Sequence, residues 1–94
     1  MTITLNKFGR VLSSRPAGAE AFNAIRPQLD PKDTHIEIDF DNVLSLAPSW
    51  ADEFFTKLKE WSKEDLSFLP SSNASVIATL RILKEMSEST TRVA

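Results

Sequence analysis

The segment Thr34-His-Ile-Glu-Ile-Asp-Phe40 decides the fold of this sequence. Its three apolar residues, Ile36, Ile38 and Phe40, alternate with polar ones, which is the spacing of a β-strand with one buried face. A strand that lies between two layers of helices is apolar throughout, so this one belongs to a sheet with one wet face. We therefore expect a sheet that is covered by helices on one side only.

A long amphipathic helix follows this strand. The spacing of apolar residues predicts a helix from Ser49 to about Ser62, and Ser49 with Asp52 approximates a capping box at its start. One arc of the helical wheel holds its large apolar residues: Trp50, Ala51, Phe54, Phe55, Leu58 and Trp61. A helix with such an arc is expected to lie on a core.

The N-terminal residues contain two short runs with β-strand composition. Thr2 to Leu5 and Arg10 to Ser13 are separated by a break at Phe8-Gly9, which predicts a small hairpin or two edge strands. An unpaired edge there would suit a homodimer.

A helix is predicted from Pro16 to Arg26, with Ser14 or Arg15 at its cap. Gly18 falls on the apolar side of this helix, where glycine weakens helix formation by about 1 kcal/mol. We expect a compensating close approach of the helix backbone to the sheet beneath it.

The C-terminal third predicts a short strand from Leu66 to Leu69 and a helix that Asn73 caps and that ends near Glu88. The apolar arc of this helix is formed by Val76, Leu80, Ile82, Leu83 and Met86. Residues 87–94 are polar and are predicted to be a frayed tail. The order ββαβαβα predicts one α/β or α+β domain over residues 1–94, with about four strands in a mixed sheet and helices mainly on one face.

Composition narrows the function classes. The 94 residues suit a single domain, the net charge is −2, and there is no cysteine. An acidic chain is a poor match for nucleic acid, and the sequence predicts a cytoplasmic protein with neither a signal peptide nor a membrane span. We expect no disulfide, cofactor or metal site, because two glycines cannot build a phosphate loop and Asp39 with Asp41 lacks the rest of a calcium loop.

An enzyme is the least favoured reading. Glu37 and Asp39 share one face of the predicted strand, but exposed carboxylates on a half-buried strand are common. His35 has no serine or aspartate near it in the sequence that would form a triad.

The transition from the central strand to the long helix is the best candidate site. Ser49 would have the backbone N–H groups and the positive end of the helix beside it, so that a phosphate on this serine would be well placed. The simpler interpretation is a capping serine. Trp50 is either a core residue or an exposed anchor for a partner.

Two motifs resemble a known family. The segment from Ile36 to Phe54 contains Asp-Phe, then a valine, then Pro-Ser-Trp-Ala-Asp-Glu, and it follows Val11-Leu-Ser-Ser-Arg-Pro-Ala-Gly18. Both are similar to the STAS-like domains of unknown function that occur in bacteria and their mobile elements. The resemblance extends from about Ile3 to Leu83.

This resemblance implies a one-sided sheet backed by helices, and a protein partner. Related anti-sigma factor antagonists are phosphorylated on a serine or threonine at the start of the corresponding helix by an ATPase of the GHKL type, related to histidine kinases. Their Asp-Ser-Ser/Thr-Gly pattern reads here as Ala47-Pro48-Ser49-Trp50, without the acid and the glycine. STAS-like domains are often encoded beside such ATPases or fused to them.

We therefore expect a small regulatory module that binds a GHKL-type ATPase and is phosphorylated, if at all, on Ser49. The residues expected to contact the partner are Ser13, Ser14, Arg15, Pro48, Ser49, Trp50, Asp52 and Glu53. The alternative is a STAS-like domain that senses a small molecule or nucleotide near the same helix. Stabilisation by a ligand in the absence of any protein partner would distinguish it.

Overall fold

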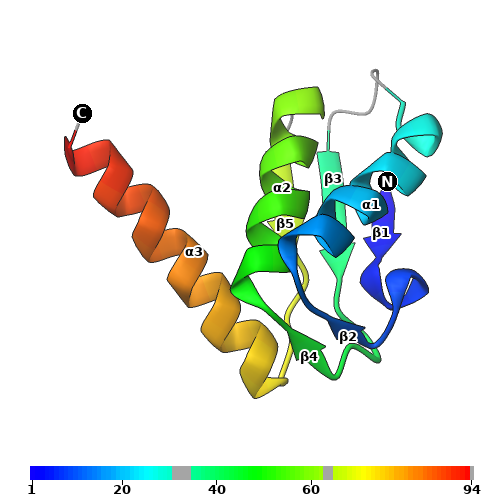
Figure 1. Ribbon diagram of the computed structural model, residues 1–94, viewed down its shortest axis with the longest axis horizontal. Coiled ribbons are helices and arrows are strands. Elements are labelled where there is room, and N and C mark those ends of the chain that lie inside the picture. The colour runs from blue at the N-terminus through cyan, green and yellow to red at the C-terminus, as the bar shows by residue number, and fades with distance from the viewer. Residues whose placement is uncertain (31–34, 63–64, 94) are drawn as a thin grey trace.

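The computed structural model describes residues 1–30, 35–62 and 65–93 (Figure 1). Within these ranges the helical elements are the α-helices α1 (Arg15–Ile25), α2 (Pro48–Ser62) and α3 (Ala74–Val93) and the short 3₁₀ turns η1 (Leu5–Phe8) and η2 (Arg26–Gln28). The α/β class is as predicted.

The described strands form two small parallel sheets instead of one mixed sheet of about four strands. The larger sheet has the order β1 (Thr2–Thr4), β3 (His35–Asp39) and β5 (Asp65–Phe68). The smaller one pairs β2 (Val11–Leu12) with β4 (Ser45–Leu46). The sequence missed β4, because a two-residue strand is too short to show alternation.

The central strand is confirmed, with Thr34 outside the described residues. Burial alternates along β3, and its partners Ile3 and Leu66 pair with Ile38 and Ile36. The opposite face carries the half-buried side chains of Glu37 and Asp39. The sheet thus has the apolar and the wet face that the alternation predicts.

The predicted N-terminal hairpin is wrong. β1 pairs with β3 and β2 pairs with β4, both in parallel, so the two N-terminal strands lie in different sheets. The reason lies between them, where η1 buries Leu5 and ends at Gly9 with φ 127°. A left-handed glycine redirects the chain at a point where other residues would be strained.

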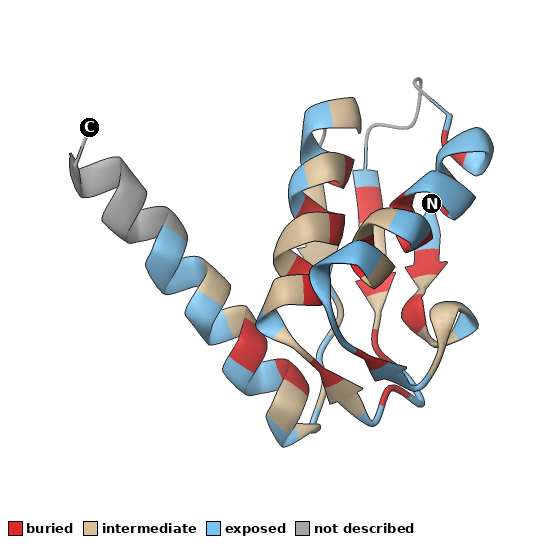
Figure 2. Cartoon of the chain, viewed as in Figure 1, coloured by how far each residue is buried: buried red, intermediate tan, exposed pale blue. Residues whose placement is uncertain are grey.

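Helices α1 and α2 pack against each other and cover the apolar face of the larger sheet (Figure 2). Helix α1 begins as predicted, because the side chain of Ser14 accepts a hydrogen bond from the Ala17 N–H at 3.3 Å. The close approach predicted at Gly18 exists, but its partner is α2 and not the sheet. A Cβ at Gly18 would lie 2.6 Å from the carbonyl oxygen of Trp50.

Helix α2 has the predicted buried arc but starts differently. The Ala51 N–H donates to the carbonyl of Ala47 at 3.1 Å, which makes Pro48 the first helical residue. Proline suits this position, since its fixed φ fits the helix and its missing N–H is not needed there. Ser49 therefore lies inside the first turn, and the predicted capping box with Asp52 does not form.

Helix α3 is capped by Asn73 as predicted. The side-chain oxygen of Asn73 accepts from the N–H groups of Ser75 and Val76 at 2.8 and 3.1 Å. The first turns are anchored to β4, where the Ser75 hydroxyl accepts from the Leu46 N–H and the Thr79 hydroxyl donates to the Leu46 carbonyl.

The C-terminal part of α3 departs from the prediction. The helix continues past Glu88 to Val93 and diverges from α2 along its length (Figure 1). Val76 is buried and Leu80 and Leu83 are partly buried, but Ile82 and Met86 are exposed. Amphipathic spacing marks a face that can be buried, and the direction of the helix leaves part of that face uncovered.

Candidate functional site

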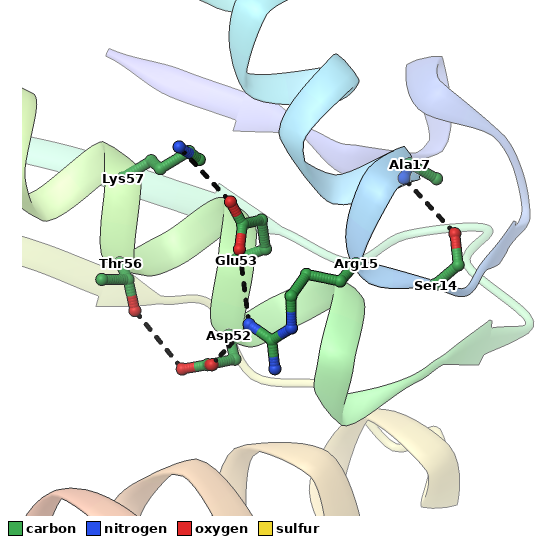
Figure 3. A network of polar contacts seen from close by, with 7 residues as sticks. All are labelled: Ser14, Arg15, Ala17, Asp52, Glu53, Thr56 and Lys57. Atoms are coloured by element: carbon green, nitrogen blue, oxygen red, sulfur yellow. Dashed lines mark hydrogen bonds and ion pairs between the residues drawn. The ribbon is translucent and has the colours of Figure 1, made fainter.

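The start of α1 and the first turns of α2 lie side by side (Figure 3). An ion pair joins them: Nη1 of Arg15 lies 2.8 Å from Oδ2 of Asp52 and 3.3 Å from Oε1 of Glu53. One guanidinium thus bridges two consecutive carboxylates of the neighbouring helix. The close packing at Gly18, one turn further along α1, is what brings the two helix starts within reach.

Both carboxylates have a second partner on α2. The Thr56 hydroxyl donates to Oδ1 of Asp52 at 3.3 Å, and Nζ of Lys57 lies 3.3 Å from Oε2 of Glu53. The hydrogen bond to Asp52, and to a smaller extent the one to Glu53, raises the pKa of Arg15. The guanidinium therefore stays charged at any physiological pH. Since the Arg15 side chain is 51% exposed, solvent screens these ion pairs, and they orient the surface more than they stabilise the fold.

The backbone of Ser14 has an unusual conformation. Its φ of 75° and ψ of 145° lie in a region that residues other than glycine seldom occupy, at a typical cost of about 1–3 kcal/mol. This turn carries the chain from β2 into α1 and leaves the side chains of Ser13 and Ser14 exposed. Nothing in the sequence marks it, because no glycine or asparagine stands there.

The sequence-predicted site residues separate into two groups. Pro48 is exposed and Ser49 is half-buried in the first turn of α2. They lie about one turn before Asp52 and Glu53, the carboxylate partners of Arg15. Trp50 does not lie at the surface. It is 2% exposed and stacks on Phe54, with ring centroids 4.9 Å apart. Trp50 is therefore a core residue, and the expectation that it contacts a partner is wrong.

A polar hollow of about 320 Å³ lies elsewhere, where the chain leaves β3 and β5. It is lined by Phe40, Asp41, Asn42, Val43, Pro70, Ser71, Ser72 and Asn73. Loops that follow neighbouring parallel strands meet at one edge of the sheet, which is where open α/β folds place ligands. Nothing in the sequence predicted this hollow, because it depends on the order of the strands in the sheet.

None of the described helices combines the length and the apolar character that crossing a membrane requires.

Comparison with known families agrees with the fold. A family model described as a STAS-like domain of unknown function matches residues 17–67. The match spans β3, β4 and α2, nearly all of α1 and most of β5. Neither the curated proteins nor the solved structures contain a match. Because the matched residues make up more than half of the chain, this protein belongs to the family of STAS-like domains of unknown function.

Proposed function

We propose that this chain is a regulatory module that binds an ATPase of the GHKL type. Its contact region, called here the α2-start surface, consists of Ser13, Ser14, Arg15, Pro48, Ser49, Asp52 and Glu53. The observation that carries the proposal is the bridge from Arg15 to Asp52 and Glu53, which joins segments distant in sequence into one surface.

The α2-start surface has the properties of a docking site. Its charged side chains are already ordered by the ion pairs between them. Binding a partner would therefore cost little further side-chain entropy. The hydroxyl of Ser13 and the ring of Pro48 are exposed beside this network. Family membership favours a partner of the GHKL type, since STAS-like domains are often encoded beside or fused to such ATPases.

Phosphorylation of Ser49 would alter this surface through simple electrostatics. Ser49 precedes Asp52 and Glu53 by three and four positions, so the three side chains share one side of α2. A phosphate adds a charge of about −1.5 to −2 at the positive end of the helix and next to two carboxylates. The added charge would compete with both acids for Arg15 and so change what the partner contacts.

The main test is a pair of arginine variants at opposite ends of α1. Arg15→Ala removes the bridge, and we expect it to weaken binding of the ATPase at least tenfold, which corresponds to about 1.4 kcal/mol. The midpoint of thermal unfolding should change little, because exposed ion pairs add little to stability. Binding is measured by calorimetry with the ATPase recovered from the native cells.

The matched control is Arg26→Ala, which removes an exposed arginine at the other end of α1. This variant should bind as the unaltered chain does. Equal affinities for both variants would contradict the proposed surface. Loss of folding in Arg15→Ala, seen by circular dichroism, would show that the fold requires the ion pair, and this would also contradict the proposal.

The hollow at the ends of β3 and β5 supports a second candidate, the sensing of a small polar molecule. Its lining offers the hydroxyls of Ser71 and Ser72, the amide of Asn42 and the carboxylate of Asp41. A ligand that binds only the folded state at a hundred times its Kd stabilises it by about 2.7 kcal/mol. Thermal unfolding with a panel of nucleotides and sugars should then show saturable stabilisation, which Ser72→Val should reduce. No stabilisation by any of them would reject this candidate.

A further inference from the structure

The proposed function makes no use of the exposed apolar residues of α3. Ile82 is 41% exposed and Met86 is also exposed, while Val76 and Thr79 at the start of the helix are buried. The change from buried to exposed residues along α3 is visible in Figure 2. Helices in proteins gain most of their stability by packing an apolar face against other elements. The exposed apolar residues of α3 therefore favour a further packing partner.

Three of the exposed apolar residues of α3 lie on one side of the helix. Ala78, Ile82 and Met86 follow one another at intervals of four residues, so they form a stripe along one side of the helix. This stripe adjoins Leu83, which is partly buried against the core. Ile77 is also exposed, but it lies about 140° around the helix from Ile82 and is outside the stripe.

The charges beside the stripe complement a second copy of the same helix. Arg81 and Glu85 are exposed and lie on the same flank of the stripe, one turn apart. Consider two antiparallel copies of α3 related by a two-fold axis at the level of Leu83. In this pair Arg81 of each chain lies opposite Glu85 of the other. The same axis brings Ile82 of each chain close to Met86 of the other, and the symmetry makes each contact occur twice.

From this self-complementarity we propose that α3 forms an antiparallel helix pair with α3 of a second copy of this chain. The interface consists of Ala78, Ile82 and Met86 flanked by Arg81 and Glu85. It is an alternative to the N-terminal sheet edge, which the sequence suggested would suit a homodimer. The proposal is independent of the proposed function, because it concerns a different surface and requires no other protein.

Sedimentation equilibrium of the purified chain tests the proposal without the ATPase. The expected result is a concentration-dependent equilibrium between monomer and dimer. Ile82→Asp should raise the dimer dissociation constant at least tenfold, since it places a charge in the apolar stripe. Ile77→Asp is the matched control: it makes the same change on the same helix at a residue of similar exposure, 44%, and should leave the dissociation constant unchanged. A monomer at all concentrations, or equal effects of the two variants, would overturn the proposal.

Charge reversal tests the antiparallel direction and does not depend on the apolar stripe. Arg81→Glu alone should weaken the dimer, because two acidic residues then face each other in both halves of the interface. The double variant Arg81→Glu with Glu85→Arg should restore the dimer. In it, the new acidic side chain at position 81 of each copy faces the new basic side chain at position 85 of the other. Failure of the double variant to recover the dimer, with helix content unchanged by circular dichroism, would exclude this pairing.

Discussion

Replacing Trp50 with alanine is expected to lower the free energy of unfolding by about 3–5 kcal/mol. Trp50 is almost completely buried, stacks on Phe54 and lies beside the ring of Phe8, with centroids 6.3 Å apart. Removing the indole leaves a cavity beneath the contact of α1 with α2. Small domains are stable by about 5–15 kcal/mol in total, so the variant should be close to unfolded at 37 °C. Urea unfolding followed by circular dichroism measures the loss.

Trp61→Ala is the matched control, because the same side chain is removed from a partly buried position on the same helix. It should be clearly less destabilising than Trp50→Ala. A change of less than about 1 kcal/mol at Trp50 would be far below the usual range for a buried tryptophan. That result would mean that Trp50 is not a core residue, and the prediction that it contacts a partner would stand again.

Gly18→Ala is expected to destabilise the fold although alanine is the better helix former. The new methyl group would lie 2.6 Å from the Trp50 carbonyl oxygen and 3.3 Å from Cβ of Glu53. A backbone oxygen cannot turn aside, so α1 must move away from α2. Overpacking of this kind costs about 1–3 kcal/mol, against a gain in helix propensity of about 1 kcal/mol.

The sign of the change makes this prediction decisive. Asn23→Ala, at an exposed position of α1, should be neutral or stabilising, because propensity alone acts there. If Gly18→Ala were stabilising as well, the close approach of the two helices would be contradicted. Since the same approach brings Arg15 to Asp52, Gly18→Ala should also weaken binding at the α2-start surface.

Local patterns predicted the elements well and their pairing poorly. The alternation at Ile36 and Ile38 predicted a one-sided strand, and the arc that includes Phe54 predicted a buried helix face; both are confirmed. Strand pairing depends on contacts between distant segments, which periodicity does not encode. β1 and β2 therefore looked like a hairpin although each pairs with a strand more than thirty residues away.

The candidate site shows the same limit. Helix-start signals led to Ser49 and to the loop at Arg15, but the ion pair that joins them depends on the packing of α1 against α2. The spacing of apolar residues along a helix also does not predict how much of the apolar face is buried by other elements. Trp50 turned out to be buried, and Ile82, on an equally regular arc, is exposed.

The two proposed surfaces would serve separate tasks. The α2-start surface would bind the ATPase, and the stripe on α3 would hold two copies together. A dimer would present two α2-start surfaces, and a dimeric partner could then engage both, which raises the apparent affinity without any new contact.

The most direct test of partner binding is site-specific photo-cross-linking in the native cells. A photoreactive amino acid replaces Pro48, on the α2-start surface, or Lys59, an exposed residue about 16 Å away near the other end of α2. Cross-linked proteins are identified by mass spectrometry. The mass of the intact chain is also measured, to detect a phosphate on Ser49. We predict a GHKL-type ATPase cross-linked from position 48 and absent from position 59. Cross-linking of the ATPase from position 59 alone, or from neither position, would contradict the proposed function.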